Sequence, residues 1–432
     1  MDQQREVQMD RRTDRPTNRR SVKDMAIRAR RASRYLAGAG ADAKNRALEL
    51  MAKSLLERAG DILEANRRDL EKAVASGLPA PMQKRLAMTP AKLESMAGGL
   101  LKVAALPDPV GRVLEARTRP NGLTIQKMSV PFGVIGIIYE SRPEVTADAA
   151  ALCFKSGNAV ILRGGTESSL SNLAVATALG AALEEAGAPV DCVQYLVDPD
   201  RSGVQEMLGL SGYMDLLIPR GGANLIRTVV LNSTVPVIET GTGNCHVYIH
   251  EKADLAMAQS IAVNAKCSNP AVCNAAETLL VDRAVAREFL PGLVSALEER
   301  GVHVRGCEES RSIVPRIVEA TEDDWETEYL DLVLAIRVVS GLDVAIDHIA
   351  RYGTMHSEAI ITRDEAAARS FKEAVDAACV YVNASTRFTD GFEFGFGAEI
   401  GISTQKLHAR GPMGLSELNT YKYVISGTGQ VR

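Results

Sequence analysis

The sequence has 432 residues, a formal net charge of −4 at pH 7 and a charged fraction of 24%. A mildly acidic chain argues against nucleic acid or an anionic membrane as a partner, because both attract basic surfaces. No apolar run is long enough to cross a bilayer. The seven cysteines lack the spacing of a zinc site or a disulfide framework, so we expect no metal and reduced thiols in a cytoplasmic protein.

The N-terminal region divides into two parts. Residues 1–20 are rich in Arg, Asp and Gln and have no apolar core, so we expect a disordered extension rather than a secretory or transit signal. Residues 22–105 are predicted to be helical, because apolar residues recur at three- and four-residue spacing, as in 47–77. Pro107 and Pro109 end this pattern.

Two further segments are predicted to form β-strands rather than helices. Residues 110–131 are predicted to form a β-hairpin with its turn at Pro120-Asn121-Gly122. The tail, residues 418–432, alternates polar and apolar residues and is predicted to be a terminal strand. It is a candidate to pair with the hairpin, within the chain or across subunits.

From residue 133 short apolar strands alternate with helices. Strands are predicted at 133–140, 159–165, 193–198 and 214–222, with helices at 144–156, 168–186 and 201–209. A second run follows residues 235–240, with strands at 247–251, 277–282, 332–340 and 357–362 and helices at 253–266 and 284–299. This alternation is typical of doubly wound parallel sheets in an α/β fold. We expect a domain boundary near residues 239–243.

Two Gly-Gly pairs lie where predicted strands end, each preceded by an arginine. The residues are Arg163, Gly164 and Gly165 in one turn and Arg220, Gly221 and Gly222 in the other. Glycines there allow a ligand close to the backbone, and the following helix N-terminus favours an anion. Arg163 is thus a candidate for a 2′-phosphate and Arg220 for a pyrophosphate. The alternative is two ordinary turns with solvated arginines.

The cysteines differ in their surroundings. A catalytic thiol has to be accessible in a polar loop, whereas a structural one is buried. Cys153, Cys192 and Cys379 lie in apolar stretches. Cys273 lies between a predicted helix and a strand, close to Cys267 at the helix end. From the spacing alone either one remains a candidate nucleophile or a bystander.

Eight segments, in order along the chain, carry a resemblance to known proteins. They are 130–165, 217–226, 241–249, 269–281, 324–339, 352–362, 380–415 and the terminal 420–432. Together they resemble the γ-glutamyl phosphate reductase family, a branch of the aldehyde dehydrogenase superfamily. The resemblance runs from about residue 22 to the end of the sequence and leaves only the N-terminal extension outside.

The resemblance implies an aldehyde-dehydrogenase-like α/β fold with a Rossmann-type cofactor domain, an α/β catalytic domain and a small β hairpin for oligomerisation. The implied NADP(H)-binding domain comprises residues 21–110 and 131–240. The implied catalytic domain with the nucleophilic cysteine comprises residues 241–384, followed by a return segment lining the cleft, 385–415. Residues 111–130 and 416–432 would form the oligomerisation element of a homodimer or homotetramer.

The resemblance also implies a reaction. The motif P-x-x-C-N-x-x-E makes Cys273 the nucleophile and leaves Cys267 outside the motif. NADPH would reduce L-glutamyl 5-phosphate to L-glutamate 5-semialdehyde and phosphate, in proline synthesis. Cys273 would first form a thioester, because covalent catalysis divides one difficult step into two easier ones.

Further site residues follow from the same resemblance. The Cys273 backbone N–H and Ser141 would stabilise the oxyanion, with Asn274 as a catalytic neighbour. Glu328 would bind the nicotinamide ribose. The remaining implied residues are Glu239 and Gly241 on the cofactor side and Arg142, His356, Asn383, Ser385 and Arg387 at the small-molecule substrate.

Two alternatives remain open at this point. Glu239 aligns with the general base of hydrolytic aldehyde dehydrogenases, so the chain is alternatively a hydrolytic NAD(P)-dependent enzyme that makes acids from aldehydes. A nucleotide-binding scaffold that has kept the fold is the second alternative. Because acyl phosphates are labile in water, glutamate 5-kinase is an expected transient partner.

Overall fold

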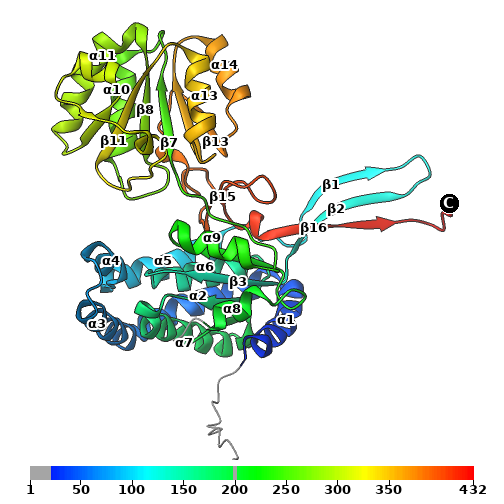
Figure 1. Cartoon of the computed structure of the whole chain (residues 1–432). Helices are drawn as coiled ribbons and strands as arrows, with labels where there is room; N and C mark the ends of the chain where they lie inside the picture. The colour runs from blue at the N-terminus through cyan, green and yellow to red at the C-terminus, as the bar shows by residue number, and fades with distance from the viewer. Residues whose placement is uncertain (1–20, 198–201) are drawn as a thin grey trace, which may run out of the picture.

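The computed structural model describes residues 21–197 and 202–432. The predicted N-terminal extension, residues 1–20, lies outside the described residues. Figure 1 shows two α/β bodies, one above the other, and a β arm that extends to one side. The lower body contains the N-terminal helices and a four-stranded sheet, and the upper body contains a seven-stranded sheet.

The predicted helical region is confirmed as five helices that pack in the lower body. They are α1 (Val22–Gly38), α2 (Ala41–Glu57), α3 (Ala59–Ala75), α4 (Ala80–Leu86) and α5 (Pro90–Ala105). Ser21 caps α1 by accepting from the Asp24 N–H, and Thr89 caps α5 by accepting from the Lys92 N–H. Such caps satisfy backbone donors that have no partner inside a helix. The buried faces of α2 and α5 pack on each other.

The first sheet is parallel, with strand order β5-β4-β3-β6. Its strands are β3 (Val134–Tyr139), β4 (Ala159–Arg163), β5 (Val193–Tyr195) and β6 (Leu216–Arg220). Its helices are α6 (Glu144–Lys155), α7 (Ser169–Glu185), α8 (Ser202–Leu208) and α9 (Ala223–Asn232). The order reverses direction beside β3, and ligands of such sheets bind at the carboxyl ends of the strands at this point. The loops after β3 and β6 therefore meet at a candidate ligand site.

The second sheet is also parallel, with order β10-β9-β11-β8-β7-β12-β13. Its strands are β7 (Cys245–Ile249), β8 (Ala276–Asp282), β9 (His303–Gly306), β10 (Val318–Glu319), β11 (Val333–Val339), β12 (Ser357–Ile361) and β13 (Cys379–Val382). Its helices are α10 (Leu255–Cys267), α11 (Arg283–Glu298), α12 (Glu308–Ile313), α13 (Leu342–Tyr352) and α14 (Glu365–Ala374). Helices cover both faces, so the central strands are buried throughout, as their apolar sequences predict.

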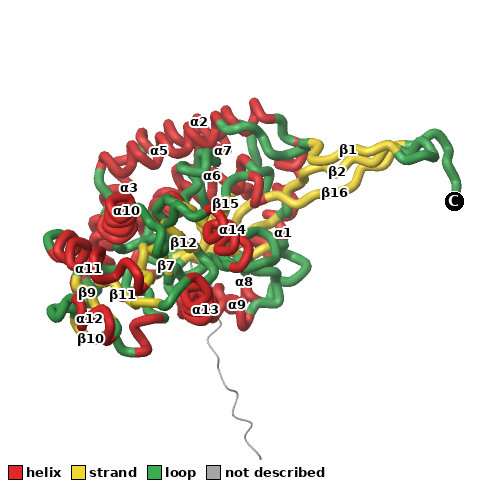
Figure 2. The backbone as a smooth tube through the Cα atoms, turned by 90° about the horizontal axis from the view of Figure 1, so that it is seen from above, coloured by secondary structure: helices red, strands yellow, loops and turns green. Residues whose placement is uncertain are grey.

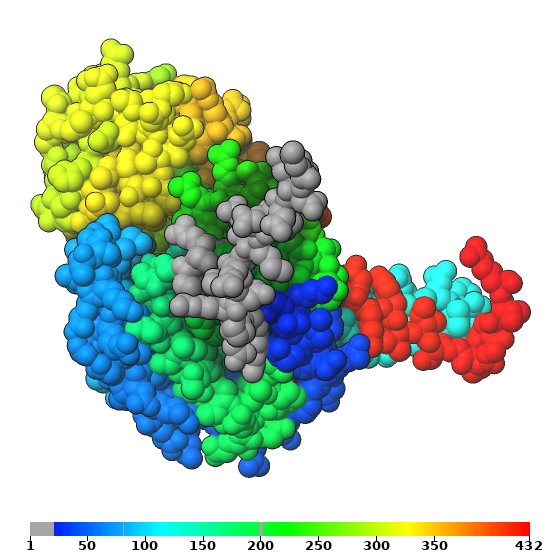
Figure 3. All heavy atoms as spheres, turned by 60° about the horizontal axis from the view of Figure 1, so that its bottom comes forward, coloured from blue at the N-terminus to red at the C-terminus, as the bar shows by residue number. Residues whose placement is uncertain are grey.

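The β arm has three antiparallel strands in the order β1-β2-β16. These are β1 (Val113–Thr118), β2 (Thr124–Pro131) and β16 (Asn419–Ser426). The predicted pairing of tail and hairpin is thus present within one chain. The arm projects from the body in two perpendicular views and in the space-filling view (Figures 1, 2 and 3).

The chain returns from the upper to the lower body before the last strand. The return includes β14 (Gly401–Ser403) and β15 (Gly411–Met413), which pair with each other. Ala398, Ile400 and Met413 are buried in the same core as the N-terminal helices. The return segment therefore fixes the two bodies to each other close to the ends of the first sheet.

Candidate active site

A cavity of about 450 Å³ lies between the two bodies and is called the cleft. The loops after β3 and β6 form one wall. The other wall comes from segments that precede β8 and β11, so it lies at the amino edge of the second sheet. Its lining residues include Arg85, Glu140, Ser141, Arg142, Arg220, Gly221, Gly222, Gly241, Cys273, Asn274, Glu328, Leu330, Arg387 and Glu399.

Cys273 lies in the loop between α10 and β8, at the cleft, and is partly exposed. Burial raises the pKa of its thiol to about 11. The Arg220 guanidinium opposes this rise in the pKa, whereas the Glu399 and Glu328 carboxylates add to it. Since the thiolate is the nucleophilic form, these three charges control the reactivity of the thiol.

Gly243 and Cys245 contact the backbone of the Cys273 loop. A Cβ on Gly243 would lie 1.5 Å from the Cys273 carbonyl oxygen, so only glycine fits there without a shift of the loop. The Cys245 thiol donates to the same carbonyl oxygen at 3.2 Å. Both residues lie where the chain enters β7, which ties the nucleophile to the second sheet.

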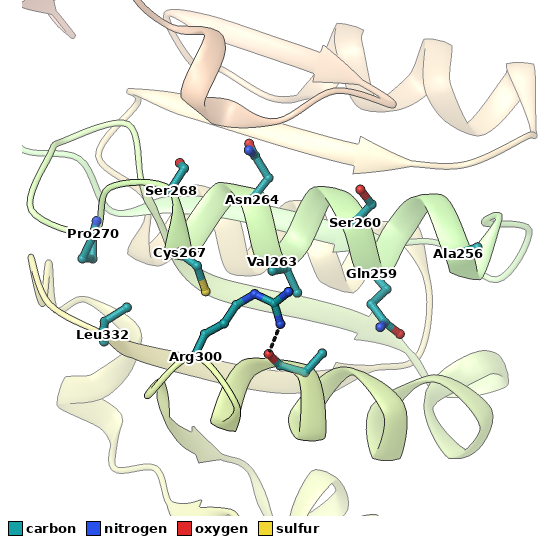
Figure 4. A pocket seen from close by; sticks show the side chains of 11 residues that line it. Ala256, Gln259, Ser260, Val263, Asn264, Cys267, Ser268, Pro270, Arg300 and Leu332 are labelled. Atoms are coloured by element: carbon teal, nitrogen blue, oxygen red, sulfur yellow. Dashed lines mark hydrogen bonds between the residues drawn. The ribbon is translucent and has the colours of Figure 1, made fainter.

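Cys267 faces a different cavity. It lines a shallow cavity of about 910 Å³ beside α10, where its sulfur points toward Arg300 (Figure 4). Arg300 itself donates to the Ala296 carbonyl oxygen at 2.7 Å. Cys267 therefore lies outside the cleft, and Cys273 is the cysteine that lines it. The three predicted core cysteines, Cys153, Cys192 and Cys379, are buried.

Asn274 and Arg387 clamp the same loop. The Asn274 amide donates to the Thr389 carbonyl oxygen at 2.8 Å, and its side-chain oxygen accepts from Arg387. Arg387 also donates to the Ser268 hydroxyl at 3.0 Å. Both residues line the cleft, but the Arg387 guanidinium is bonded to both ends of the Cys273 loop. It thus holds the loop as well as facing the cleft.

Ser141 lines the cleft in a left-handed conformation with φ of 40°. Its N–H and hydroxyl both donate to Glu167, at 2.8 and 2.5 Å. Added Cβ atoms on the neighbouring glycines would clash: Gly165 with the Glu167 carboxylate at 2.1 Å and Gly164 with Asn172 at 2.0 Å. The first Gly-Gly pair therefore makes room for these two side chains and does not line the cleft.

Arg163, the predicted 2′-phosphate contact, is buried in this structure. The side chain is 6% exposed and lies near the hydroxyls of Tyr139 and Tyr195, whose pKa values it lowers against the effect of burial. It does not line the cleft. The sequence pattern does not record whether the side chain of a strand-end arginine is buried or exposed.

The second Gly-Gly pair does line the cleft. The Gly222 N–H, at the start of α9, donates to a Glu140 carboxylate oxygen at 2.9 Å, and a Cβ on Gly221 would clash with Glu140. The Arg220 guanidinium lies against Gly401, where a Cβ would be 2.3 Å from its Nη1. Arg220, predicted at a pyrophosphate, is thus placed beside the thiol, while Glu140 occupies the helix N-terminus.

The predicted cofactor carboxylates occupy different places. Glu328 lines the cleft, and its carboxylate accepts from the Gly243 N–H at 2.7 Å. Burial raises the pKa of Glu328. Glu239 is half-buried, its N–H donates to Gln405 at 3.0 Å, and it does not line the cleft. Gly241, two residues on, does line it.

Three predicted substrate contacts lie outside the cleft. His356 is fully buried, with its Nδ1 2.8 Å from the Ser357 hydroxyl, and burial lowers its pKa to about 4. The Asn383 amide exchanges two hydrogen bonds of 2.9 Å with the Thr362 backbone. Ser385 is 4% exposed and caps a short turn. In this structure these side chains support strand ends and turns, and the predicted substrate contacts that line the cleft are Arg142 and Arg387.

Sequence reasoning missed residues that come to the cleft from distant elements. Glu399 arrives on the return segment, Arg85 on α4, and Glu140 from the loop after β3. Glu399 had a readable signal, a carboxylate in a run of glycine and apolar residues. The sequence carries no such signal for Arg85, because this residue lies on an exposed helix that is far along the chain from the cysteine motif of residues 270–277.

Residues 21–197 and 202–432 contain no group of His, Cys, Asp and Glu side chains that would suit a metal ion. In the same described ranges, no helix has the length and apolar character needed to span a membrane.

Comparison with known proteins identifies the family. The aldehyde dehydrogenase family model matches residues 17–332. A γ-glutamyl phosphate reductase of Moorella thermoacetica is 59% identical over 411 residues, covering 95% of this chain and 98% of the relative. One from Carboxydothermus hydrogenoformans is 58% identical over the same length, with coverage of 95% and 99%.

Solved structures agree with this family and its fold. The crystal structure of a γ-glutamyl phosphate reductase from Thermotoga maritima superposes with a TM-score of 0.94 at 50% identity, covering 96% of this chain and all of the other. An acetylating aldehyde dehydrogenase from Geobacillus thermoglucosidasius has a TM-score of 0.66 at 18% identity, with coverage of 95% and 97%, and shares the fold. The expected aldehyde-dehydrogenase-like fold is confirmed.

Proposed function

The chain belongs to the γ-glutamyl phosphate reductase family of the aldehyde dehydrogenases, and from this premise we propose that it reduces L-glutamyl 5-phosphate with NADPH. The products are L-glutamate 5-semialdehyde and phosphate, in the cytoplasmic synthesis of proline. The observation that carries the proposal is Cys273 in the cleft, beside Arg220 and Glu399. A cysteine with a cation and a carboxylate beside it suits covalent acyl transfer.

In the first step Cys273 forms a thioester. Glu399, whose pKa burial raises, takes the thiol proton, and Arg220 stabilises the thiolate. The sulfur attacks the acyl carbon, the bond from that carbon to the phosphate oxygen breaks, and phosphate leaves with the electron pair. The Cys273 backbone N–H stabilises the negative oxygen of the intermediate; Ser141 lines the same cleft, with its N–H and hydroxyl on Glu167 in this structure. Arg142 faces the charged groups of the substrate.

The cleft carries residues that would hold a nicotinamide dinucleotide. NADPH, when bound, supplies the hydride that reduces the thioester. Glu328 would hold ribose hydroxyls, and the loop of residues 220–222 lies at the strand-order reversal where such cofactors bind. Arg163 is buried in this structure and does not line the cleft, whereas Arg85 lines it and is a candidate for the 2′-phosphate. Once the thioester is reduced, its carbon–sulfur bond would break, which would release the aldehyde and regenerate the Cys273 thiolate.

The hydrolytic alternative has less support. It requires a base that activates water at the thioester, and Glu239 does not line the cleft. The scaffold alternative requires cofactor binding without turnover, although the nucleophile loop is clamped in place by Asn274 and Arg387. Acyl transfer to Cys273 with phosphate as the leaving group therefore remains the best-supported chemistry.

The test runs the reaction in reverse, as NADP⁺ reduction with glutamate semialdehyde, with and without inorganic phosphate. We expect phosphate-dependent turnover that is lost in Cys273→Ala. The matched control is Cys267→Ala, which removes a thiol six residues away that lines the other cavity and should keep wild-type activity. Running the assay with NAD⁺ measures the coenzyme preference.

Each other outcome contradicts a defined part of the proposal. Equal rates without phosphate would mean that water resolves the thioester and would favour the hydrolytic enzyme. Activity in Cys273→Ala but not in Cys267→Ala would reverse the choice of nucleophile. Cofactor binding without turnover under either condition would favour the scaffold.

We also propose that the enzyme is a homodimer or homotetramer joined through the β arm. A transient contact with glutamate 5-kinase would protect the labile acyl phosphate from water. Both proposals concern the whole molecule and leave the chemistry in the cleft unchanged.

A further inference from the structure

A fully buried ion pair lies directly behind the Cys273 loop. The Lys266 ammonium, at the end of α10, is 2.5 Å from a Glu277 carboxylate oxygen at the start of β8, and both side chains are 0% exposed. The two residues bracket the loop that carries Cys273. Burial of an unpaired charge is costly, so each partner depends on the other.

The second carboxylate oxygen of Glu277 reaches a different segment. It accepts from the Leu330 N–H at 3.3 Å, and Leu330 has the left-handed φ of 53°. The Lys266 ammonium also lies 5.9 Å from the centre of the Tyr329 ring. The pair therefore fixes the turn of residues 328–330, whose Glu328 and Leu330 line the cleft.

Glu328 connects the 328–330 turn to the Cys273 loop. Glu328 accepts from the Gly243 N–H at 2.7 Å, and Gly243 packs against the Cys273 carbonyl group. Lys266 also lowers the pKa of Glu328 against the effect of burial, and after Glu277 it is Asp331, next to the same turn, that raises the pKa of Lys266. Loss of Glu277 would leave the ammonium to attract Glu328 and Asp331, and so to pull on the 328–330 turn.

We propose that Lys266 and Glu277 are a positioning pair, which holds Glu328 toward the cleft and thereby sets the affinity for the nicotinamide cofactor. The role of Glu328 at the cofactor rests on the function proposed above. Glu277 neutralises Lys266 and anchors the 328–330 turn, so that Glu328 stays on Gly243 and at the cleft. The pair acts through Glu328 and touches no reactant itself.

The test compares Glu277→Gln with the double variant Lys266→Met/Glu277→Gln. In the single variant the amide keeps an acceptor for Leu330 but leaves Lys266 unpaired, so we expect KM for NADP⁺ to rise by about tenfold or more with kcat changed less. The double variant removes the unpaired charge and should return KM to within about threefold of wild type. The dissociation constant of NADPH, measured by nucleotide fluorescence, should follow the same order without any turnover.

The matched control is Lys44→Met. Lys44 is also fully buried and pairs with Asp108 at 2.5 Å, in the lower body. It should lower the melting temperature but leave cofactor KM and affinity unchanged. If Glu277→Gln lowers the melting temperature as Lys44→Met does and leaves cofactor affinity at the wild-type value, the pair is merely structural. An equally weak cofactor affinity in the double variant also contradicts the proposal.

Failure of the proposed function gives a different result. A wild-type protein that binds NADPH without phosphate-dependent turnover would overturn the reductase, while the NADPH affinities of the same variants still test the pair.

Discussion

At the scale of single residues, charge decides what Cys273 can do. Burial raises the pKa of the thiol, Arg220 lowers it and Glu399 raises it further. The same thiol in water would titrate closer to neutral pH. The site therefore needs Arg220 to recover a useful fraction of thiolate, whereas the sequence pattern predicted a cofactor contact for this arginine.

We predict that Arg220→Gln slows alkylation of Cys273 by iodoacetamide. Removing the cation takes away a group that favours the thiolate, so the pKa of Cys273 moves further above about 11. At a pH well below the pKa, the thiolate fraction falls about tenfold each time the pKa rises by one. The rate is measured between pH 7 and 10, with the modified cysteine identified by peptide mass spectrometry.

Arg300→Gln is the matched control, because Arg300 lowers the pKa of Cys267 in the other cavity, against the larger effect of burial. It should slow the alkylation of Cys267 and leave that of Cys273 unchanged. Glu399→Gln should have the opposite sign and speed alkylation of Cys273. An unchanged rate in Arg220→Gln, or a slower one in Glu399→Gln, would refute the assigned electrostatics.

At the scale of elements, the nucleophile loop is positioned by segments that are distant in sequence. Gly243 and Cys245 support it where the chain enters β7, Asn274 bonds to the segment after β13, and Arg387 spans its two ends. The loop itself contains no regular structure between α10 and β8. Its conformation is therefore imposed by neighbours rather than by local propensity.

We predict that Gly243→Ala reduces kcat by about a hundredfold, because the added Cβ would displace the Cys273 backbone and misplace the thiol. Steady-state kinetics and circular dichroism together show whether activity falls while the fold remains. Gly180→Ala is the control, since no atom lies within 4 Å of its Cβ position in α7. It should keep full activity and gain about 0.5–1 kcal/mol of stability. Full activity in Gly243→Ala would show that the loop adapts.

At the scale of the whole molecule, the β arm is exposed on a body that is otherwise well packed. Tyr421, Tyr423 and Ile425 on β16 are 49%, 51% and 59% exposed, and Leu114 on β1 is 49% exposed. Apolar side chains on a projecting sheet with free edges are typical of an interaction surface. These observations support the proposal that copies of the chain associate through the arm.

We predict that Tyr421→Asp/Ile425→Asp converts the oligomer to a monomer, because charges replace apolar contacts at the expected interface. Analytical ultracentrifugation at micromolar concentration measures the mass. Tyr35→Asp, at a residue 39% exposed on α1, is the control and should leave the oligomer intact. A monomeric wild type, or an unchanged mass in the double variant, would refute the arm as the interface.

Part of the fold could be predicted from the sequence. Apolar strands such as 133–140 and 277–282 predicted buried parallel sheets, because strands covered on both faces need apolar residues on both. The α14 helix was missed although its cap was readable, since Asp364 precedes it and accepts from the N–H groups of Ala366 and Ala367. β10 has only two residues, which is too short for a pattern.

The sequence by itself determined the family, the two parallel sheets and Cys273 as the candidate nucleophile, because motif order and hydrophobic period are local properties. Only the tertiary structure decided which charges meet. It placed Arg220 beside the thiol, buried Arg163 and His356 away from the cleft, and brought Glu399 from the return segment. The direction of a side chain and the approach of distant segments depend on packing between elements, which no local pattern records.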